Sequence, residues 1–167
     1  MALASRQMGI YVREKDLVLG LDPGRDKTGF AFVNISGELL LSGIFPSCET
    51  EKFFEDFTPY IIERNIDFCA EDFISRVKFI AVGDGTTSKI FTEKLRTITS
   101  HEIITVDERN TTLEARNLYW KIHKPGIFLR LLPEGMRVPP RVVDDLAAFA
   151  VALRGLKKYR DIRRNKL

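Results

Sequence analysis

Acidic residues occur at three points where the sequence changes from an apolar run to a turn or a helix pattern. Asp22 ends one apolar run, Asp107 and Glu108 end another, and Asp144 and Asp145 precede an alanine-rich segment. Hydrolysis of a phosphodiester by divalent metal ions needs several oxygen ligands, with open positions for water and substrate. Carboxylates from separate elements can supply those ligands, so the three positions predict a metal site if the fold brings them together.

Each acid also has an ordinary structural explanation. Asp22 precedes a Pro-Gly dipeptide and could form a turn. Asp107 and Glu108 could be solvated residues before a helix, and Asp144 and Asp145 could be a helix cap and a first-turn acid. Only the occurrence of all three acidic positions, in the order and contexts that one site would require, favours metal binding.

The elements that would position these acids follow from the apolar periodicity. Leu17 to Asp22, Gly29 to Ile35 and Glu38 to Phe45 are predicted as three consecutive antiparallel strands. Strands alternating with helices downstream favour a parallel second half of the sheet. Downstream, the predicted helices run from Phe53 to Arg64, with an extension over 67–77, and from Ser88 to Ile98, and the predicted strands run from Phe79 to Val82 and from Ile103 to Val106. A further helix is predicted to start at the capping-box sequence Thr111-Thr112-Leu113-Glu114, followed by a loop over 123–141. The last helix is predicted from Val143, and its small residues let it lie close to the sheet, namely Ala147, Ala148, Ala150, Ala152 and Gly155.

Length and composition favour a single domain. The chain has 167 residues, of which 44% are hydrophobic, with an irregular lead-in expected over 1–15 and a basic tail over 159–167. The two cysteines, Cys48 and Cys69, suggest neither a disulfide framework nor a zinc site, which fits a reduced, cytoplasmic compartment. The longest apolar run, from Leu146 to Leu153, is too short to span a membrane, so we expect no membrane contact. Residues 154–167 hold seven basic residues and one acidic residue, while the whole chain has a net charge of only +3. Such a basic end suits a polyanionic partner, or simply complements a helix dipole.

The acidic positions lie within three longer motifs. These are Leu19-Gly20-Leu21-Asp22-Pro23-Gly24-Arg25-Asp26-Lys27-Thr28-Gly29-Phe30-Ala31, Val106-Asp107-Glu108-Arg109-Asn110-Thr111-Thr112-Leu113-Glu114-Ala115, and Asp144-Asp145-Leu146-Ala147-Ala148. Together they resemble the YqgF/RuvX family of RNase H-like nucleases over residues 17–158, and the second motif is the most specific. The resemblance implies an α/β fold of the RNase H-like (ribonuclease H superfamily) type, with a mixed five-stranded sheet, antiparallel first three strands and helices on both faces.

The resemblance also implies roles for individual residues. Asp22, Glu108 and Asp144 would bind Mg²⁺ or Mn²⁺ as the catalytic acids, with Asp107 as a close helper. Arg109 would orient a carboxylate or contact a phosphate, or else form a structural salt bridge. The candidate nucleic-acid-binding residues are Arg25, Lys27, Arg109, Lys121, Lys124, Arg137 and Arg141. The last four of these could equally be solvated loop or helix residues, and of Tyr119 and Trp120, which could stack on a base, one is expected in the core.

One segment departs from the family. Gly83-Asp84-Gly85-Thr86-Thr87-Ser88 replaces the family's Gly-Leu-Pro or Gly-Phe-Pro and the short loop after it, which ends Asn/Asp-Gly-Thr. Asp84 could be an additional metal ligand or a turn residue. The departure indicates a divergent paralogue and leaves activity to be tested.

Three functions are consistent with these patterns. The leading hypothesis is a metal-dependent endonuclease acting on structured nucleic acid, either in RNA precursor processing, such as that of pre-16S rRNA, or in Holliday junction resolution. The junction substrate would favour a homodimer, because two symmetric strands are cut. The alternative is a catalytically degenerate RNase H-like module that binds nucleic acid or protein. A phosphotransferase of the actin and sugar-kinase type, whose first phosphate loop resembles Asp22-Pro23-Gly24, is disfavoured by the length of the chain.

Overall fold

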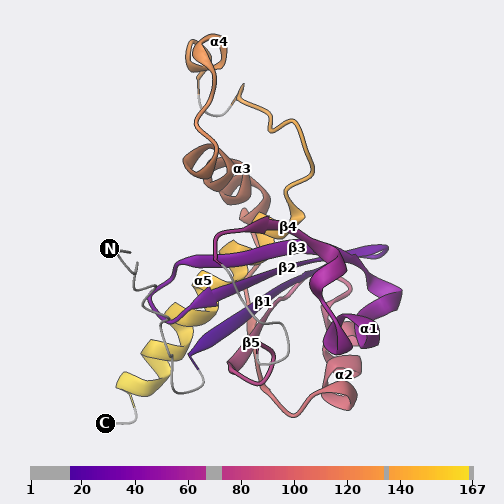
Figure 1. The fold of residues 1–167 in the computed structure, drawn as a ribbon. Coiled ribbons are helices and arrows are strands. Elements are labelled where there is room, and N and C mark those ends of the chain that lie inside the picture. Colours follow the sequence, from indigo (N-terminus) through magenta and orange to yellow (C-terminus); the bar gives the residue numbers. More distant parts are fainter. Residues whose placement is uncertain (1–15, 67–72, 134–135, 166–167) are drawn as a thin grey trace, which may run out of the picture.

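The computed structural model describes residues 16–66, 73–133 and 136–165, and these form a mixed α/β structure (Figure 1). Within them lies a six-stranded sheet of order β4-β3-β2-β1-β5-β6. The first four strands pair antiparallel to their neighbours, while β1, β5 and β6 run parallel. The strands are β1 (Leu17–Pro23), β2 (Lys27–Asn34), β3 (Leu39–Pro46), β4 (Ile61–Arg64), β5 (Val77–Gly83) and β6 (Glu102–Val106).

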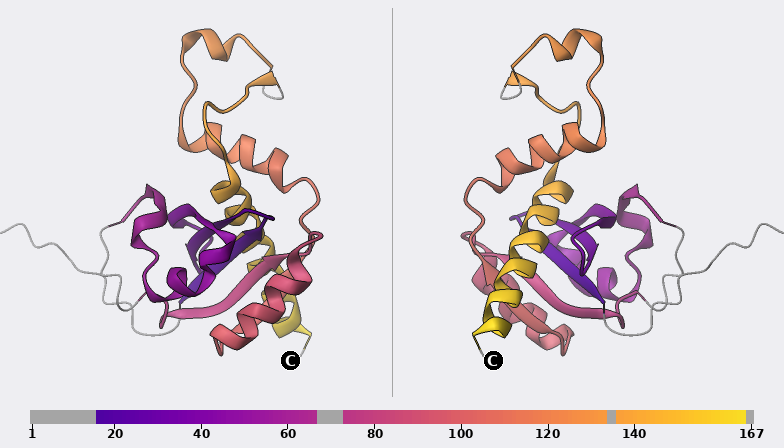
Figure 2. Two further views of the ribbon diagram at one scale, coloured as in Figure 1. Left: turned by 90° about the vertical axis from the view of Figure 1, so that its right-hand side faces the viewer. Right: turned by 90° about the vertical axis from the view of Figure 1, so that its left-hand side faces the viewer.

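Helices cover both faces of the sheet, as the sequence predicted. The long helix α5 lies across one face, and α1 and α2 lie on the opposite side (Figures 1 and 2). The helices are α1 (Thr50–Glu55), α2 (Ser88–Ile98), α3 (Thr111–Ile122), α4 (Ile127–Arg130) and α5 (Asp144–Arg164), and 3-10 turns span Ser47–Glu49 and Thr58–Tyr60. In the part of the chain so described, no helix combines the length and apolarity needed to cross a bilayer.

The alternation of side chains along β1 divides the core into two layers. Leu17, Leu19 and Leu21 belong to the layer that includes the phenylalanines of β2, β3 and α1. Val18 belongs to the layer under α5. Because successive strand residues face opposite sides of a sheet, Gly20 and Asp22 lie on the same side as Val18.

Helix α5 lies very close to the sheet, and its small residues explain why. A Cβ atom added to Gly20 would lie 2.2 Å from the carbonyl oxygen of Ala148 and 2.7 Å from the Cβ of Ala152. Of the predicted stripe, Ala148, Ala152 and Gly155 therefore do face the sheet, whereas Ala147 packs in the cluster with α3. This close approach sets the distance between the first turn of α5 and strands β1 and β2.

The prediction of five strands and of a helix from Phe53 to Arg64 is wrong. Helix α1 ends at Glu55, and the segment continues as a 3-10 turn and then as β4, the sixth strand, which pairs with β3. The Asp56 carboxylate accepts hydrogen bonds from the backbone N–H and hydroxyl of Thr58, which stabilises a turn there. Pro59 then has no N–H to continue the helix. Of the predicted extension over 67–77, residues 67–72 lie outside the described residues and 73–76 form a turn.

The start of α3 is where predicted, but the capping box does not form. Asn110 occupies the cap position with a left-handed φ of 65°, and no side chain caps the helix. The Thr111 hydroxyl instead donates to the Glu108 carbonyl oxygen, 2.8 Å away. The other predicted strands and helices are confirmed within one or two residues at most ends, and residues 159–164 of the predicted basic tail continue α5.

Residues 123–133 and 136–142, which we call the arm, project from the body beyond α3 (Figure 2). The predicted loop contains the short helix α4. Within the arm, Arg130 Nε donates to the Pro125 carbonyl (3.0 Å) and Arg137 Nε to the Leu132 carbonyl (2.9 Å). Trp120 Nε1 of α3 donates to the Arg137 carbonyl (3.0 Å), which joins the arm to α3. Large apolar side chains of the arm are exposed, namely Ile127, Leu131, Met136, Val138 and Val142.

Candidate metal centre

Asp22 and Glu108 lie at the same edge of the sheet and on the same side of it. Each extends a row of residues that faces α5, since Asp22 follows Val18 and Gly20 on β1, and Glu108 follows Ile104 and Val106 from β6. Strands β1, β5 and β6 are parallel, so their carboxyl ends meet at one edge. By the same alternation, Asp107 does not belong to this row, which distinguishes the two adjacent acids.

Asp144 is placed beside Asp22 by the contact between α5 and β2. Asp22 pairs with Gly29 across the β1–β2 hairpin. A Cβ atom added to Gly29 would lie 2.1 Å from the backbone oxygen of Asp144, so only glycine permits this approach. The first residue of α5 thus lies directly over the strand position opposite Asp22.

The electrostatics of Asp22 reflect both neighbouring acids. The pKa of the Asp22 carboxyl is raised from 3.8 to about 6, first by burial and then by the negative charges of Glu108 and Asp144. Ionised Asp22 is therefore unfavourable in the free protein. A cation bound among these carboxylates would offset that repulsion.

In the structure, the charge of Asp144 is balanced by Lys27. The Lys27 ammonium nitrogen lies 2.8 Å from Asp144 Oδ2, and the two side chains are 48% and 33% exposed. Sequence reasoning placed Lys27 among the nucleic-acid-binding residues, whereas the structure pairs it with a predicted metal ligand.

The unusual loop after β5 holds Glu108. Asp84 Oδ1 accepts a hydrogen bond from the Glu108 backbone N–H at 3.0 Å, and the Asp84 N–H donates to the Val106 carbonyl at 2.9 Å. The Glu108 carboxylate lies over Gly83 and Gly85. A Cβ atom added to Gly85 would lie 2.1 Å from Glu108 Oε1, and one added to Gly83 would lie 2.8 Å from Glu108 Oε2. Of the two roles open to Asp84, the structure therefore supports a turn residue, and one that positions Glu108.

Arg154 of α5 fixes the same segment from the other side. Its guanidinium donates to the backbone carbonyls of Asp107 and Arg109, the latter at 2.9 Å, and pairs with Glu114. The Asp107 carboxylate pairs with the exposed Arg109 guanidinium at 2.8 Å, and hydrogen bonds from the Arg109 side chain and backbone N–H lower the pKa of Asp107. Arg109 thus forms the salt bridge that was one of its predicted roles.

The donor chemistry of the three acids fits a hard divalent cation, which prefers carboxylate oxygens. Their present arrangement is nevertheless open. Among the residues with described positions, no group of three acidic, histidine or cysteine side chains is close enough to hold a metal ion. Strand β5 lies between β1 and β6, so the backbones that carry Asp22 and Glu108 are roughly 10 Å apart.

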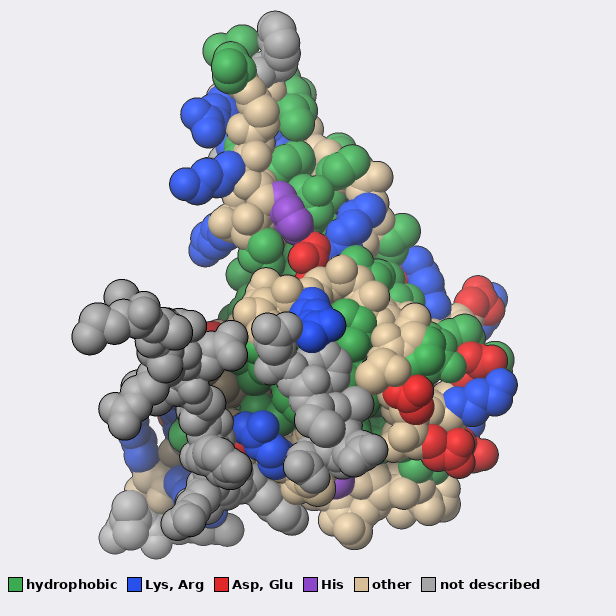
Figure 3. Space-filling view, viewed as in Figure 1, with side chains coloured by type: hydrophobic (Ala, Val, Ile, Leu, Met, Phe, Trp, Pro, Cys, Tyr) green, Lys and Arg blue, Asp and Glu red, His purple; other side chains and the backbone are tan. Residues whose placement is uncertain are grey.

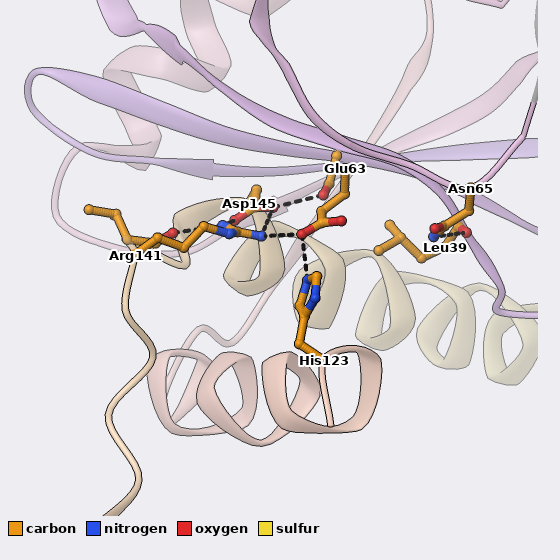
Figure 4. A network of polar contacts seen from close by, with 8 residues as sticks. Leu39, Glu63, Asn65, His123, Arg141 and Asp145 are labelled. Atoms are coloured by element: carbon orange, nitrogen blue, oxygen red, sulfur yellow. Dashed lines mark hydrogen bonds and ion pairs between the residues drawn. The ribbon is translucent and has the colours of Figure 1, made fainter. Parts of the chain in front are cut away.

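Asp145 has a different environment from its neighbour Asp144. It is fully buried, accepting from the Ser42 hydroxyl at 2.8 Å and from Arg141 Nη1 at 2.7 Å. Arg141 also donates to Glu63 at 2.8 Å, and His123 pairs with the same oxygen at 2.7 Å (Figure 4). Partial burial raises the pKa of Glu63, but the hydrogen bonds from Arg141 and His123 lower it, and the net result is a lowered pKa. This network ties the base of the arm to β3, β4 and the start of α5.

The remaining predicted nucleic-acid-binding residues divide into two groups. Arg25, Lys121 and Lys124 are exposed. Arg137 and Arg141 instead hold the arm together, since Arg137 donates to backbone carbonyls of the arm and Arg141 contacts two carboxylates. Lys and Arg side chains line the arm alongside hydrophobic ones (Figure 3).

Sequence reasoning missed three positioning roles. Asp84 was assigned no partner, Arg154 was counted only as part of a basic end, and Asp145 was grouped with Asp144. The parity of the row Ile104, Val106, Glu108 was a usable signal for Glu108. No local signal marks the contacts of Arg154 or of Asp145, whose partner Ser42 lies 103 residues away.

Comparison with known proteins adds little. No family model and no curated protein matches the chain. Among solved structures, a ROK family glucokinase from Streptomyces griseus, in complex with glucose and AMPPNP, matches with a TM-score of 0.35 and 13% identity. The match covers 60% of this chain and 36% of the glucokinase chain, and at this TM-score it assigns neither fold nor function.

Proposed function

We propose that the protein is a metal-dependent endonuclease with an RNase H-like domain, a divergent relative of the YqgF/RuvX family. The observation that carries the proposal is the placement of Asp22, Glu108 and Asp144 on one side of one sheet edge, where burial and the charges of Glu108 and Asp144 raise the pKa of Asp22. The antiparallel pairing of the first three strands and the parallel pairing of β1, β5 and β6 support the proposal, although the described sheet has six strands and not five.

In this proposal the three carboxylates hold Mg²⁺ or Mn²⁺, which would supply an activated water and neutralise charge at the scissile phosphate. Asp84 and Arg154 keep Glu108 in place. Exposed Arg25, close to Asp22 in the β1–β2 turn, is available for a phosphate of the substrate. Lys27, paired with Oδ2 of Asp144, competes with a cation for the charge of that carboxylate.

The test combines metal binding with cleavage. Calorimetry with Mn²⁺ should detect binding to the wild-type protein and none to the Asp22→Asn plus Asp144→Asn variant. The wild type should cut a structured RNA or a branched DNA in Mn²⁺ but not in chelator. The variant Asp26→Asn, which removes an exposed acid from the same turn, is the matched control and should keep both properties. Persistent cutting by the double variant would refute the mechanism.

A second candidate is an RNase H-like module that binds nucleic acid or protein without cutting it. The observation in its favour is the Lys27–Asp144 ion pair, which neutralises one acid without any metal. Nucleic-acid binding without Mn²⁺ binding, in folded protein with the substrate present, would favour this candidate. A homodimer and a cytoplasmic location remain predictions, which light scattering and cell fractionation can test.

A further inference from the structure

A pocket at the junction of α3 and the arm is separate from the carboxylates. It has a volume of about 240 Å³ and is lined by Asn117, Trp120, Lys121 and Arg137. We propose that this pocket binds an unpaired nucleotide of the nucleic-acid substrate. The proposal deepens the function proposed above and rests on it.

The indole of Trp120 is held rigidly at this pocket. Its Nε1–H donates to the Arg137 carbonyl oxygen at 3.0 Å, and the Tyr119 ring stands at 89° to it with centroids 4.9 Å apart. Tyr119 is in the core, while Trp120 remains partly exposed. An aromatic ring already fixed by its neighbours loses little conformational entropy when a base stacks on it.

The polar residues around the indole match the other parts of a nucleotide. The exposed Asn117 amide can both donate to and accept from a base edge. Lys121 is exposed and, among the described residues, has no acidic partner, so its ammonium is available to a phosphate. The volume is below that of pockets for drug-sized ligands and suits a single base.

The charge of the surrounding chain favours a polyanion. Residues 111–141 contain six basic and two acidic residues. One of the two acids, Glu114, is paired with Arg154 of α5. Lys124 lies exposed at the start of the arm, beyond Lys121.

The pocket is also suitably placed relative to the candidate metal centre. Helix α3 begins three residues after Glu108 and carries Trp120 nine residues further along. At 1.5 Å per residue, Trp120 is about 14 Å along the helix from Thr111. A strand that passes the carboxylates could therefore reach the pocket a few nucleotides away. A fully paired duplex could not offer a base to it, so the pocket selects substrates with single-stranded or branched segments.

Trp120 is the only tryptophan, so its fluorescence reports on the pocket directly. The protein is titrated in chelator with a short single-stranded homopolymer, a blunt duplex of equal length, and polyglutamate. Stacking should quench the fluorescence with the single strand. The duplex and polyglutamate should quench much less at equal charge. Absence of quenching by the single strand, or equal quenching by polyglutamate, would overturn the proposal.

Variants that keep the tryptophan sharpen the test. Asn117→Ala and Lys121→Ala should each weaken single-strand binding at least about threefold, within the range expected for losing one hydrogen bond or phosphate contact. Lys89→Ala removes one exposed charge from α2, outside the pocket, and should weaken binding less than Lys121→Ala does. Equal effects of the two lysine variants would count against a specific pocket.

The pocket and the nuclease can fail separately. Quenching in chelator without cleavage in Mn²⁺ would support nucleotide binding at the pocket and refute the proposed nuclease activity. Cleavage in Mn²⁺, with Trp120 fluorescence unchanged by substrate and with Asn117→Ala as active as wild type, would leave the nuclease standing and reject the pocket.

Discussion

The raised pKa of Asp22 makes a quantitative prediction about stability. The carboxyl pKa rises from 3.8 to about 6 on folding, so the folded state binds protons more tightly than the unfolded chain does. Stability therefore falls as pH increases between these two values. A shift of roughly two units, at about 1.4 kcal/mol per unit, gives a cost of about 3 kcal/mol above pH 6.

Asp22→Asn should remove this cost, because the amide cannot ionise. Urea denaturation should show the variant more stable than wild type by up to about 3 kcal/mol near pH 8, and by about half of that near pH 5. Asp26→Asn shows how much of the gain comes from removing any one negative charge from the turn. Saturating Mn²⁺ should reduce the advantage of Asp22→Asn, because the cation stabilises only the protein that binds it.

One result would refute this reasoning. If Asp22→Asn is no more stable than wild type near pH 8, and an NMR titration gives the Asp22 carboxyl an ordinary pKa, then burial and the charges of Glu108 and Asp144 do not act on it as the structure indicates. A pKa near 6 without any gain for the variant would instead mean that the asparagine loses interactions of its own, and the electrostatic argument would stand.

Three further variants test separate contacts. Lys27→Met frees Asp144 for a cation and should tighten Mn²⁺ binding about two- to fivefold by calorimetry, as for a partly exposed ion pair; unchanged affinity would argue against competition. Gly85→Ala should displace the adjacent carboxylate and weaken Mn²⁺ binding, whereas Gly126→Ala, where an added Cβ meets nothing within 4 Å, should not. Asp145→Ala should lower the free energy of unfolding by about 3–5 kcal/mol in urea, because it leaves a guanidinium without its buried partner; a loss below about 1 kcal/mol would contradict this.

The local pattern predicted most of the sheet and helices because each element has a clear apolar period. The row Val18, Gly20, Asp22 needs only the two-residue repeat of a strand to place Asp22 on the face of α5. The segment from Phe53 to Arg64 failed because its apolar residues fit a helical period, while Pro59 and the partner strand β3 decide its structure. Pairing with an edge strand is a long-range contact that a local period does not contain.

The site shows the same division between local and long-range information. Sequence reasoning predicted a site at three acidic positions, because each stands at the end or start of an element, and the family resemblance selected Asp22, Glu108 and Asp144 among them. It could not identify what surrounds them, since Lys27 at the start of β2 pairs with Asp144 at the start of α5, and Arg154 reaches the Asp107 carbonyl from 47 residues away. The departure at Gly83–Ser88 was visible in the sequence, but its effect, the support of Glu108, depends on the packing of one loop against another.

Asp144 and Asp145 show how one helix turn can serve two purposes. Consecutive helix residues are rotated by about 100°, so the two carboxylates face different directions. Asp145 is buried against Ser42 and Arg141, which anchors the start of α5 and the base of the arm. Asp144, whose side chain is 33% exposed, is thereby held over β2 beside Asp22. The buried Asp145 thus fixes the position of the candidate metal ligand Asp144, and the arm, which contributes Arg137 to the Trp120 pocket, is fastened at the same point. A change at Asp145 should therefore disturb both the candidate metal centre and the pocket, although its carboxylate belongs to neither.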